Sequence, residues 1–331
     1  MKIAFFNTKS YDQAYFDKAN EAFDIPINYF ETSLNADTAT LAREHEAVCV
    51  FVNDTVDAEV IEKLAEGGTK VILLRSAGFN HIDIEAAEKH KVTLLRVPAY
   101  SPHAVAEHAL ALIMTLNRKT HKAYNRVREN NFSLERLTGF DLYGKKVGVI
   151  GTGKIGAIFA RNMQGLGCEV VAFDPYPDDE LEKQGVKYLE LDELFGEVDI
   201  ISLHTPLNDK THHIINSHAV SLMKKGVMII NTSRGALIDT KAVIKGLKDG
   251  HIGYLGIDVY EQEEQLFFKD LSETIIPDDM IARLMSFPNV LVTAHQAFFT
   301  AEALTEIAHT TLQNLQDFAD EKSDLPNEVK R

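Results

Sequence analysis

The stretch VGVIGTGKIGAIFARNM, residues 147–163, combines an apolar strand, a glycine-rich turn and the beginning of a helix. Gly151, Gly153 and Gly156 have the spacing GxGxxG, and they stand between the expected strand and the expected helix, which is the context this motif requires. Gly151 permits a tight turn, Gly153 lets the backbone approach a pyrophosphate, and Gly156 permits close packing of helix on strand. The N–H groups at the start of the helix can bind phosphate oxygens. The stretch therefore predicts a dinucleotide-binding unit.

The next expected strand, EVVAFD, ends in Asp174, which follows Gly151 at about the offset of 20 residues expected of a ribose-binding acid. A carboxylate at this position can accept hydrogen bonds from both ribose hydroxyls, and it would repel a 2′-phosphate. The following residues, PYPDDE, add acidic groups and no arginine. The sequence therefore predicts NAD rather than NADP as the cofactor.

Apolar runs alternate with helix-compatible stretches on both sides of this motif. From residue 145 onward the expected strands are KVGVIG, EVVAFD, DIISLH, GVMIIN, LGIDVY and NVLVTA. In the first hundred residues they are KIAFFN, AVCVFV, KVILLRSAG and VTLLRV, with helical patterns at 57–66 and 83–90. Alternation of this kind is typical of parallel sheets with helices on their faces. We expect an α/β protein with two doubly wound parallel-sheet domains.

The stretch between the two alternating regions has helical spacing of its apolar residues and begins at Pro102, a residue suited to a first helical turn. We expect one long or broken helix over 102–130 that links the domains. The tail from Thr300 presents apolar residues on one helical face, which needs a partner surface. We expect it to return to the N-terminal domain. The predicted domains are therefore 1–100 with 299–331, and 101–298.

Composition narrows the functional classes. A formal net charge of −15 over 331 residues, with no basic stripe, argues against a nucleic-acid partner. The N-terminus turns polar too early for a signal peptide, and no apolar run approaches the length of a membrane span. Cys49 and Cys168 lie in or beside apolar segments without a CxxC partner. Buried thiols in a cytoplasmic protein are the expectation.

Polar residues follow three of the later strands, where a nucleotide-binding core does not require them. IINTSRG offers Arg234, DVYEQEEQLFF offers Glu261, Glu263 and Glu264, and NVLVTAHQAFF offers His295. Ligands of open α/β sheets bind outside the carboxyl ends of the strands, so these groups could converge on one substrate. Each alone is more often a solvated surface group. Their joint placement beside a dinucleotide motif favours a catalytic site.

The sequence closely resembles the D-isomer-specific 2-hydroxyacid dehydrogenase family, and within it the fermentative D-lactate dehydrogenases. The resemblance covers nearly the whole chain and is most specific in RSAGFNHID, VPAYSPHAVAEHAL, YGKKVGVIGTGKIG, NTSRGALID, DVYEQEEQLFF and AHQAFFTAEAL. It implies a Rossmann-type NAD domain, a flavodoxin-like substrate domain completed by the C-terminal helix, and a cleft between them. It also implies the reversible transfer of a hydride between NADH and pyruvate, giving D-lactate.

The resemblance assigns site residues by position. It implies the catalytic set Arg234, Glu263 and His295, and a substrate-binding loop over 76–80 in which the backbone of Ala77 and Gly78 binds the substrate. The implied cofactor contacts are Gly151, Gly153, Lys154, Ile155, Gly156, Asp174, Thr205, Pro206, Thr211, Thr232, Ser233, Arg234 and Asp258.

The implied roles fit the chemistry of the residue types. The planar guanidinium of Arg234 can hold a carboxylate through two parallel hydrogen bonds. Protonated His295 would donate to the ketone oxygen while the cofactor delivers the hydride, and Glu263 would hold the imidazole and favour its charged form. The family places residues such as Tyr100 and Phe298 against the small side chain of the substrate, and their bulk would favour pyruvate over larger 2-oxo acids.

Several histidines are set aside. His204 ends a strand, but the resemblance makes it only a neighbour of the cofactor site. His212 and His213 are adjacent and are expected to point to different sides. His103 and His108 are five apart, and no metal site is expected.

Two alternatives stay open. The first is the same chemistry on a bulkier 2-oxo acid such as phenylpyruvate or 2-oxoisocaproate. The second is an NAD-sensing binding protein that keeps the fold without catalysis, against which the intact Arg, Glu and His set weighs. The resemblance also implies a homo-oligomer, a dimer or a tetramer, with 102–130 as a plausible contact.

Overall fold

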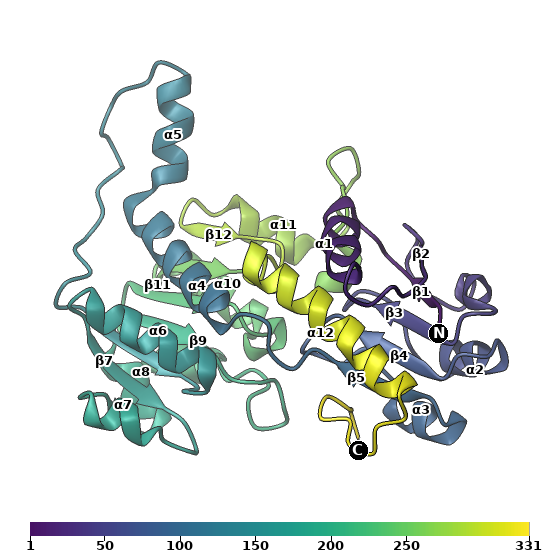
Figure 1. The fold of residues 1–331 in the computed structure, drawn as a ribbon. Coiled ribbons are helices and arrows are strands. Elements are labelled where there is room, and N and C mark those ends of the chain that lie inside the picture. Colours follow the sequence, from purple (N-terminus) through teal and green to yellow (C-terminus); the bar gives the residue numbers. More distant parts are fainter. Residues whose placement is uncertain (331) are drawn as a thin grey trace. The chain divides into compact units, whose positions relative to one another are not determined.

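The computed structural model describes residues 1–330, which divide into two compact units. The first unit comprises 1–101 together with 299–331, and the second comprises 102–298 (Figure 1). Both are built from a parallel sheet with helices, so the predicted α/β class with two doubly wound sheets is confirmed. Among the helices of this described part, none is long and apolar enough to cross a membrane.

The first unit contains a five-stranded parallel sheet in the order β2-β1-β3-β4-β5. The strands are β1 (Ile3–Phe5), β2 (Ile27–Tyr29), β3 (Ala47–Val50), β4 (Val71–Leu74) and β5 (Thr93–Arg96). The helices from this part of the chain are α1 (Ser10–Asn20), α2 (Ala58–Glu66) and α3 (Ile84–His90), with a 3-10 turn at Ala39–Ala42. The sequence analysis did not identify β2, because its three residues are half-buried and include an asparagine.

The C-terminal helix completes the first unit. This helix, α12 (Ala301–Ala319), packs against α1, β4 and β5. Its apolar face is buried, including Leu304, Ile307, Leu312 and Leu315. Thr300 caps its start by accepting a hydrogen bond from the amide of Ala303 at 3.3 Å. The helical pattern of the tail therefore serves to bury one face against this sheet.

The second unit contains a seven-stranded parallel sheet in the order β12-β11-β10-β9-β6-β7-β8. The strands are β6 (Lys146–Ile150), β7 (Glu169–Phe173), β8 (Lys187–Tyr188), β9 (Ile200–Leu203), β10 (Val227–Asn231), β11 (Ile252–Ile257) and β12 (Val290–Val292). Six of these were expected, and the two-residue β8 was not, because it has no apolar run. The helices of this unit are α4 (Pro102–Arg118), α5 (Thr120–Arg128), α6 (Lys154–Gly165), α7 (Asp179–Lys183), α8 (Leu191–Glu197), α9 (Ser217–Leu222), α10 (Thr240–Lys248) and α11 (Asp279–Ser286).

Both faces of this second sheet are covered by hydrophobic clusters. One cluster includes buried side chains of α4 and α6, and the other includes buried side chains of α8, α9 and α10. Strand β6 pairs with β7 on one side and with β9 on the other. The strand order therefore reverses at β6, which is the point where open α/β sheets bind ligands.

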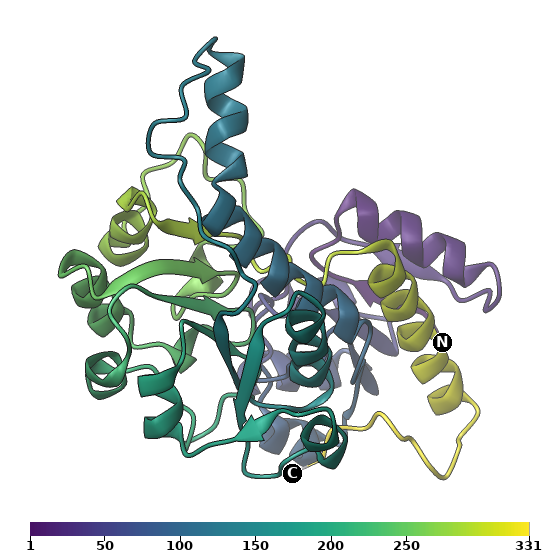
Figure 2. The same ribbon diagram turned by 90° about the vertical axis from the view of Figure 1, so that its left-hand side faces the viewer.

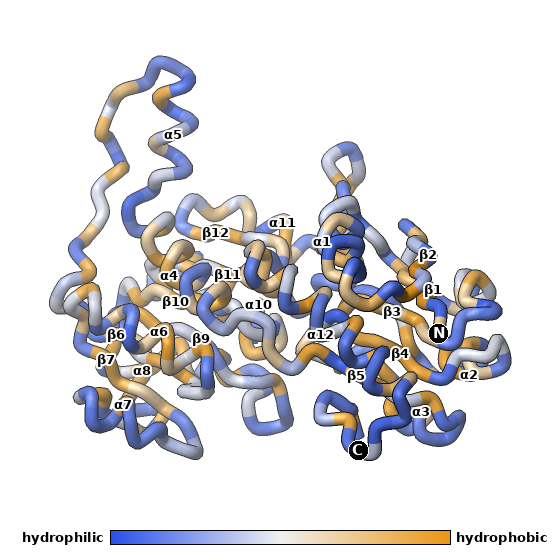
Figure 3. The backbone as a smooth tube through the Cα atoms, in the orientation of Figure 1, coloured by the Kyte–Doolittle hydropathy of each residue, from blue (hydrophilic) through white to orange (hydrophobic). Residues whose placement is uncertain are grey.

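The stretch expected as one long or broken helix is broken. Helix α4 (Pro102–Arg118) packs on the sheet, and α5 (Thr120–Arg128) follows after Lys119, whose φ of 51° lies in the left-handed region. Helix α5 and the chain after it extend away from the sheet of their own unit as an arm (Figures 1 and 2). Figure 3 shows hydrophobic residues concentrated in the strands, whereas the arm is mostly hydrophilic with separate hydrophobic positions.

Candidate active site

The glycine-rich turn after β6 has the geometry that the motif predicts. Gly151 has a φ of +94°, and a Cβ atom there would lie 2.7 Å from the carbonyl group of His204. A Cβ atom on Gly156 would lie 1.9 Å from the carbonyl oxygen of Gly151. Side chains at these two positions would therefore force the turn away from the sheet or the helix away from the turn.

The start of α6 is open to a ligand. Gly153 caps the helix without any side-chain hydrogen bond, and a Cβ atom there would meet nothing within 4 Å. Lys154 is exposed and Ile155 is half-buried in the first helical turn. A hollow of about 470 Å³ is lined by residues that include Thr152, Gly153 and Lys154. Free amides at the positive end of a helix fit the diphosphate of a dinucleotide.

Asp174 follows β7 beside this turn. Its carboxylate accepts hydrogen bonds from the amide of Thr152 at 2.6 Å and from the amide of Tyr176 at 2.8 Å. These bonds fix its orientation. Because a carboxylate has about four acceptor positions, two remain for ribose hydroxyls.

The predicted cofactor residues after β9 and β10 line the same edge of the sheet. The hydroxyl of Thr211 donates to the carbonyl oxygen of Pro206 at 2.6 Å, which closes the loop that begins at Thr205. Ser233 donates to the carbonyl oxygen of Leu203 at 2.8 Å.

Thr232, which directly follows β10, has a buried hydroxyl that a bound cofactor could engage. It is 7% exposed, and its hydroxyl oxygen is buried with no hydrogen-bond partner among the residues the structure describes. An unpaired buried hydroxyl is unfavourable and calls for an explanation such as a bound group. The residues at this edge therefore fit a dinucleotide.

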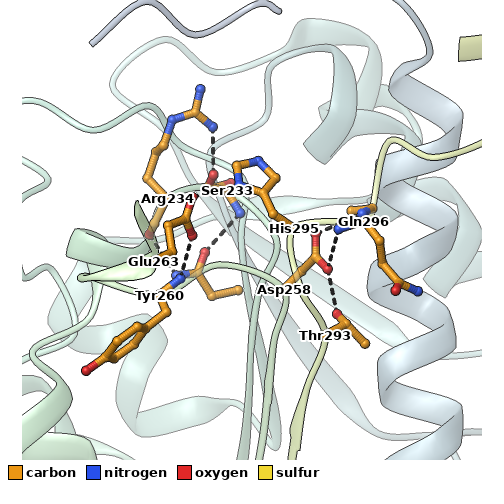
Figure 4. A network of polar contacts seen from close by, with 10 residues as sticks. Ser233, Arg234, Asp258, Tyr260, Glu263, Thr293, His295 and Gln296 are labelled. Carbon is orange, nitrogen blue, oxygen red and sulfur yellow. Dashed lines mark hydrogen bonds and ion pairs between the residues drawn. The ribbon is translucent and has the colours of Figure 1, made fainter. Parts of the chain in front are cut away.

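The predicted catalytic histidine and glutamate form a pair. Nδ1 of His295 and Oε1 of Glu263 are 2.7 Å apart, and their side chains are 20% and 21% exposed (Figure 4). The other carboxylate oxygen, Oε2, accepts a hydrogen bond from the amide of Tyr260 at 2.8 Å. The carboxylate is thus held at both oxygens, and it orients the ring so that Nε2 is the nitrogen left for a substrate.

Arg234 lies directly after β10 on a turn built by Asn231. The side-chain amide of Asn231 donates to the carbonyl oxygen of Arg234 at 2.8 Å, and its oxygen accepts from the amide of Ser233 at 3.0 Å. The guanidinium donates to the carbonyl oxygen of Ser233 at 2.7 Å, and within residues 1–330 it forms no ion pair with a carboxylate. In the view of Figure 4 it extends toward the same side of the network as the His295 ring. It can therefore bind an anion.

The three glutamates of the acidic loop have different surroundings. Glu261 bonds to His213 and to Thr240, and Glu264 is exposed. Of the three, Glu263 is the one the structure brings to His295. The sequence alone could not choose among them, and the choice implied by the family resemblance agrees with this geometry.

Asp258 is fully buried and saturated with hydrogen bonds from its own unit. Its carboxylate accepts hydrogen bonds from the hydroxyl of Thr293 at 2.5 Å and from the amide of Gln296 at 2.9 Å (Figure 4). It also accepts from the amide of Ala297 at 2.8 Å and lies 3.5 Å from Nε2 of His108. Burial opposes ionisation, but these hydrogen bonds outweigh it and lower the pKa of the carboxyl group. The carboxylate thus fixes the chain around His295.

The backbone of His295 has a φ of 53°, and its amide donates to the carbonyl oxygen of Asp258 at 2.7 Å. A left-handed conformation is unusual for a residue with a side chain and persists where surrounding bonds fix it. The network of Asp258 supplies those bonds.

Gly235 is a residue that the sequence analysis missed. A Cβ atom there would lie 2.0 Å from the carbonyl carbon of Tyr260 and 2.4 Å from the amide nitrogen of Glu261. The segment that carries Arg234 therefore packs backbone to backbone against the segment that precedes Glu263. The Thr293 and His108 contacts to Asp258 were also missed, because no spacing in the sequence relates positions so far apart.

Three of the other predicted substrate residues, Ala77, Gly78 and Tyr100, belong to the first unit, and Phe298 belongs to the second. In the loop after β4, the amides of Ala77 and Gly78 donate to no acceptor within the described chain. The carbonyl oxygens of the same two residues are bonded. Ser76 donates to that of Gly78 at 2.8 Å, and Arg96 donates to that of Ala77 at 3.0 Å. Tyr100 is half-buried after β5. Phe298, at the end of the second unit, is buried.

One prediction about the histidines is wrong. His212 and His213 were expected to point to different sides, but their rings stack with centroids 3.9 Å apart. The reason is that His213 has a φ of 52°, so the alternation of an extended chain does not apply. As for metals, no cluster of three or more His, Cys, Asp or Glu side chains suited to an ion occurs in the part of the chain that the structure describes.

Residues 110–297 match the family model described as D-isomer specific 2-hydroxyacid dehydrogenase, NAD binding domain. The chain is 52% identical to the D-lactate dehydrogenase of Escherichia coli K12 over 330 residues, which covers 99% of this chain and 100% of that protein. The apo-structure of D-lactate dehydrogenase from Escherichia coli superposes with a TM-score of 0.92 at 50% identity, covering 100% of both chains. The D-lactate dehydrogenase from Aquifex aeolicus complexed with NAD and lactic acid has a TM-score of 0.87 at 33% identity, covering 99% of both.

Proposed function

Because this chain belongs to the D-isomer specific 2-hydroxyacid dehydrogenase family, and is therefore an oxidoreductase that uses NAD, we propose that it reduces pyruvate reversibly to D-lactate. The observation that carries the proposal is the pair of His295 and Glu263, which lies on the same sheet edge as Arg234 and the nucleotide-binding turn. An acid, a cation and a dinucleotide site are what the reduction of a 2-oxo acid requires.

Arg234 binds the substrate carboxylate in this proposal. Its guanidinium has no carboxylate partner in the described chain, so it is available for two parallel hydrogen bonds to an incoming carboxylate. The family resemblance also assigns the amides of Ala77 and Gly78 and the side chains of Tyr100 and Phe298 to the substrate, and we propose them as substrate-binding residues.

His295 transfers the proton. When bound, NADH supplies the hydride to the carbonyl carbon, and the oxygen then gains a proton from Nε2 of the protonated imidazole. Glu263 holds Nδ1 at 2.7 Å, and so stabilises the charged ring and fixes its direction. In the reverse direction the neutral ring accepts the proton of the hydroxyl group.

The test is NADH oxidation by the purified protein with different 2-oxo acids and cofactors. We expect pyruvate to be used more efficiently than phenylpyruvate. Because Asp174 would repel a 2′-phosphate, NADH should support turnover at least about tenfold better than NADPH, a difference of about 1.4 kcal/mol. Equal efficiency with both cofactors would remove the assignment of Asp174, and absence of turnover with any 2-oxo acid would remove the proposal.

We also propose that the chain forms a homo-oligomer through its arm. Four apolar side chains on α5 and the segment after it are about half to more than four-fifths exposed: Tyr124, Val127, Phe132 and Leu134. Exposed apolar side chains on a projecting arm can be covered by a second copy of the chain. Light scattering of the wild type and of Phe132→Ser tests this.

The two buried free thiols, Cys49 and Cys168, fit a cytoplasmic location.

A further inference from the structure

Glu261 of the acidic loop is bonded at both of its carboxylate oxygens. Its Oε1 lies 2.7 Å from Nε2 of His213, and its Oε2 accepts from the amide of Thr240 at 3.0 Å and from the hydroxyl of the same residue. Thr240 is the first residue of α10, so the carboxylate sits at the positive end of that helix. Three donor atoms from two residues thus fix the position of Glu261.

His213 brings a third segment into the same junction. Its amide donates to the carbonyl oxygen of Ala236 at 2.8 Å, while its side chain reaches Glu261. Its left-handed backbone and the stacked ring of His212 fix the direction of the imidazole. A non-glycine residue with positive φ at a functional loop is a reason to ask what the conformation achieves.

The junction leads directly to the catalytic carboxylate. The peptide that joins Tyr260 to Glu261 packs against Gly235 with no room for a side chain. The amide of Tyr260, on the adjacent peptide, donates to Oε2 of Glu263, whose Oε1 holds His295. Displacement of Glu261 would therefore move the group that holds the catalytic pair.

We propose that His213 and Glu261 are positioning residues, which hold the segment 260–263 so that Glu263 keeps the imidazole of His295 in place. The proposal rests on the proposed function of the catalytic pair. Neither His213 nor Glu261 touches the substrate or the cofactor in it. Both act through the backbone of Tyr260.

Replacement of His213 or Glu261 should affect proton transfer more than the binding of cofactor or substrate. The hydrogen bonds that close the cofactor loop, from Thr211 to Pro206 and from Asn208 to Thr211, do not involve the side chain of His213. The turn that carries Arg234 is built by Asn231. Loss of the imidazole should therefore leave NADH affinity unchanged and change the KM for the 2-oxo acid less than kcat.

The experiment compares four single variants with the wild type, using whichever 2-oxo acid the wild type reduces best. His213→Ala should lower kcat about tenfold, because small displacements of catalytic groups have effects of this order, with KM raised less than about threefold and the Kd of NADH changed less than about twofold. His213→Gln keeps an N–H donor and should recover most of the loss. Glu261→Gln should lower kcat as His213→Ala does.

His218→Ala is the matched control. His218 also pairs with a carboxylate, that of Asp192 at 3.4 Å, but both side chains are about two-thirds exposed. This variant should keep the kcat of the wild type. Equal kcat values for His213→Ala, Glu261→Gln and His218→Ala would overturn the proposal, as would a loss that appears only in KM or only in the melting temperature.

A crystal structure of His213→Ala separates this proposal from the proposed function, because it needs no turnover. We expect the 2.8 Å hydrogen bond from the amide of Tyr260 to Glu263 to be lost, and Glu263 and His295 to be displaced together while they keep their contact. An unchanged catalytic pair in that structure would overturn the positioning role even if the variant were slow. Should His213→Ala fail to fold, the structure of Glu261→Gln gives the same test.

Discussion

Two strands of the second unit, β9 and β12, are each followed within three residues by a histidine, and the two histidines have opposite surroundings. His204 follows β9, packs on the ring of Phe159 at 4.8 Å, and bonds through Nε2 to the hydroxyl of Ser202. Burial lowers the pKa of His204 to about 3. His295 follows β12, is partly exposed, and pairs with Glu263.

The difference teaches that position at the edge of the sheet does not decide the chemistry of a histidine. His204 is held neutral over the ordinary pH range, so it can fill space and cannot deliver a proton. His295 has a carboxylate at one ring nitrogen and solvent access at the side chain, which are the features of an acid–base group. The sequence shows a histidine at both strand ends, and only the surroundings separate them.

The largest expected effect comes from replacing each histidine in turn. His295→Gln removes the proton donor and should lower kcat for pyruvate reduction by about 10²- to 10⁴-fold. His204→Asn should keep kcat within about threefold, because the side chain donates no proton to substrate. Steady-state assays of both variants check this, and a comparable loss in both would make the comparison of the two strand ends wrong.

Strand β10, which lies next to β9 in the sheet, provides the next test. Arg234→Lys keeps the positive charge and loses the planar pair of donors, so the KM for pyruvate should rise by about ten- to a hundredfold, corresponding to about 1.5–3 kcal/mol. NADH affinity, measured by fluorescence titration, should change little. A KM equal to that of the wild type would return Arg234 to the status of an ordinary surface residue.

A smaller effect should appear in the pH profile of Glu263→Gln. Without the negative charge the protonated ring of His295 is less stable, so the alkaline limit of pyruvate reduction should move to lower pH. Lactate oxidation, which needs the neutral ring, should extend to lower pH in the same variant.

Glu264→Gln and Glu261→Gln are the controls for that profile. Glu264 is exposed, and Glu261 acts at a distance from the ring, so neither variant should move the pH limit even where kcat falls. A moved limit in one of them, with an unmoved limit in Glu263→Gln, would identify a different carboxylate as the partner of His295.

The last expected effect concerns stability rather than activity. The pKa of His204 is about 3 in the folded chain and about 6.5 when unfolded, so between these values the unfolded state binds more protons. Above pH 6.5 the ring is neutral in both states and does not affect the free energy of unfolding. Below pH 6.5 the unfolded chain gains a proton at His204, so the free energy of unfolding falls by at most about 1.36 kcal/mol per pH unit. Urea unfolding of His204→Asn at pH 4 to 7 should show a shallower pH dependence than the wild type, whereas His218→Asn should not.

The sequence predicted those features that depend on short repeating patterns. Apolar runs gave the buried strands, and three glycines gave the turn after β6, where φ and close contacts exclude side chains. Strands β2 and β8 were missed because they are two or three residues long and lack an apolar run.

The contacts that support the pair of Glu263 and His295 were not predictable in the same way. The amide of Tyr260 that holds Glu263 belongs to the backbone and has no signature of its own. The contact between His108 and Thr293 joins positions 185 apart in the sequence. The stacked rings of His212 and His213 depend on the left-handed backbone of His213, and a histidine in the sequence does not indicate that conformation.

The close approach at Gly235 has a consequence for redesign and for divergence among relatives. Because two backbones touch there without space for a methyl group, the segment bearing Arg234 and the segment at 260–261 cannot be exchanged independently. A graft intended to widen substrate choice has to transfer both segments as one block. Natural variants that carry any side chain at position 235 should show a compensating shift at 260–261.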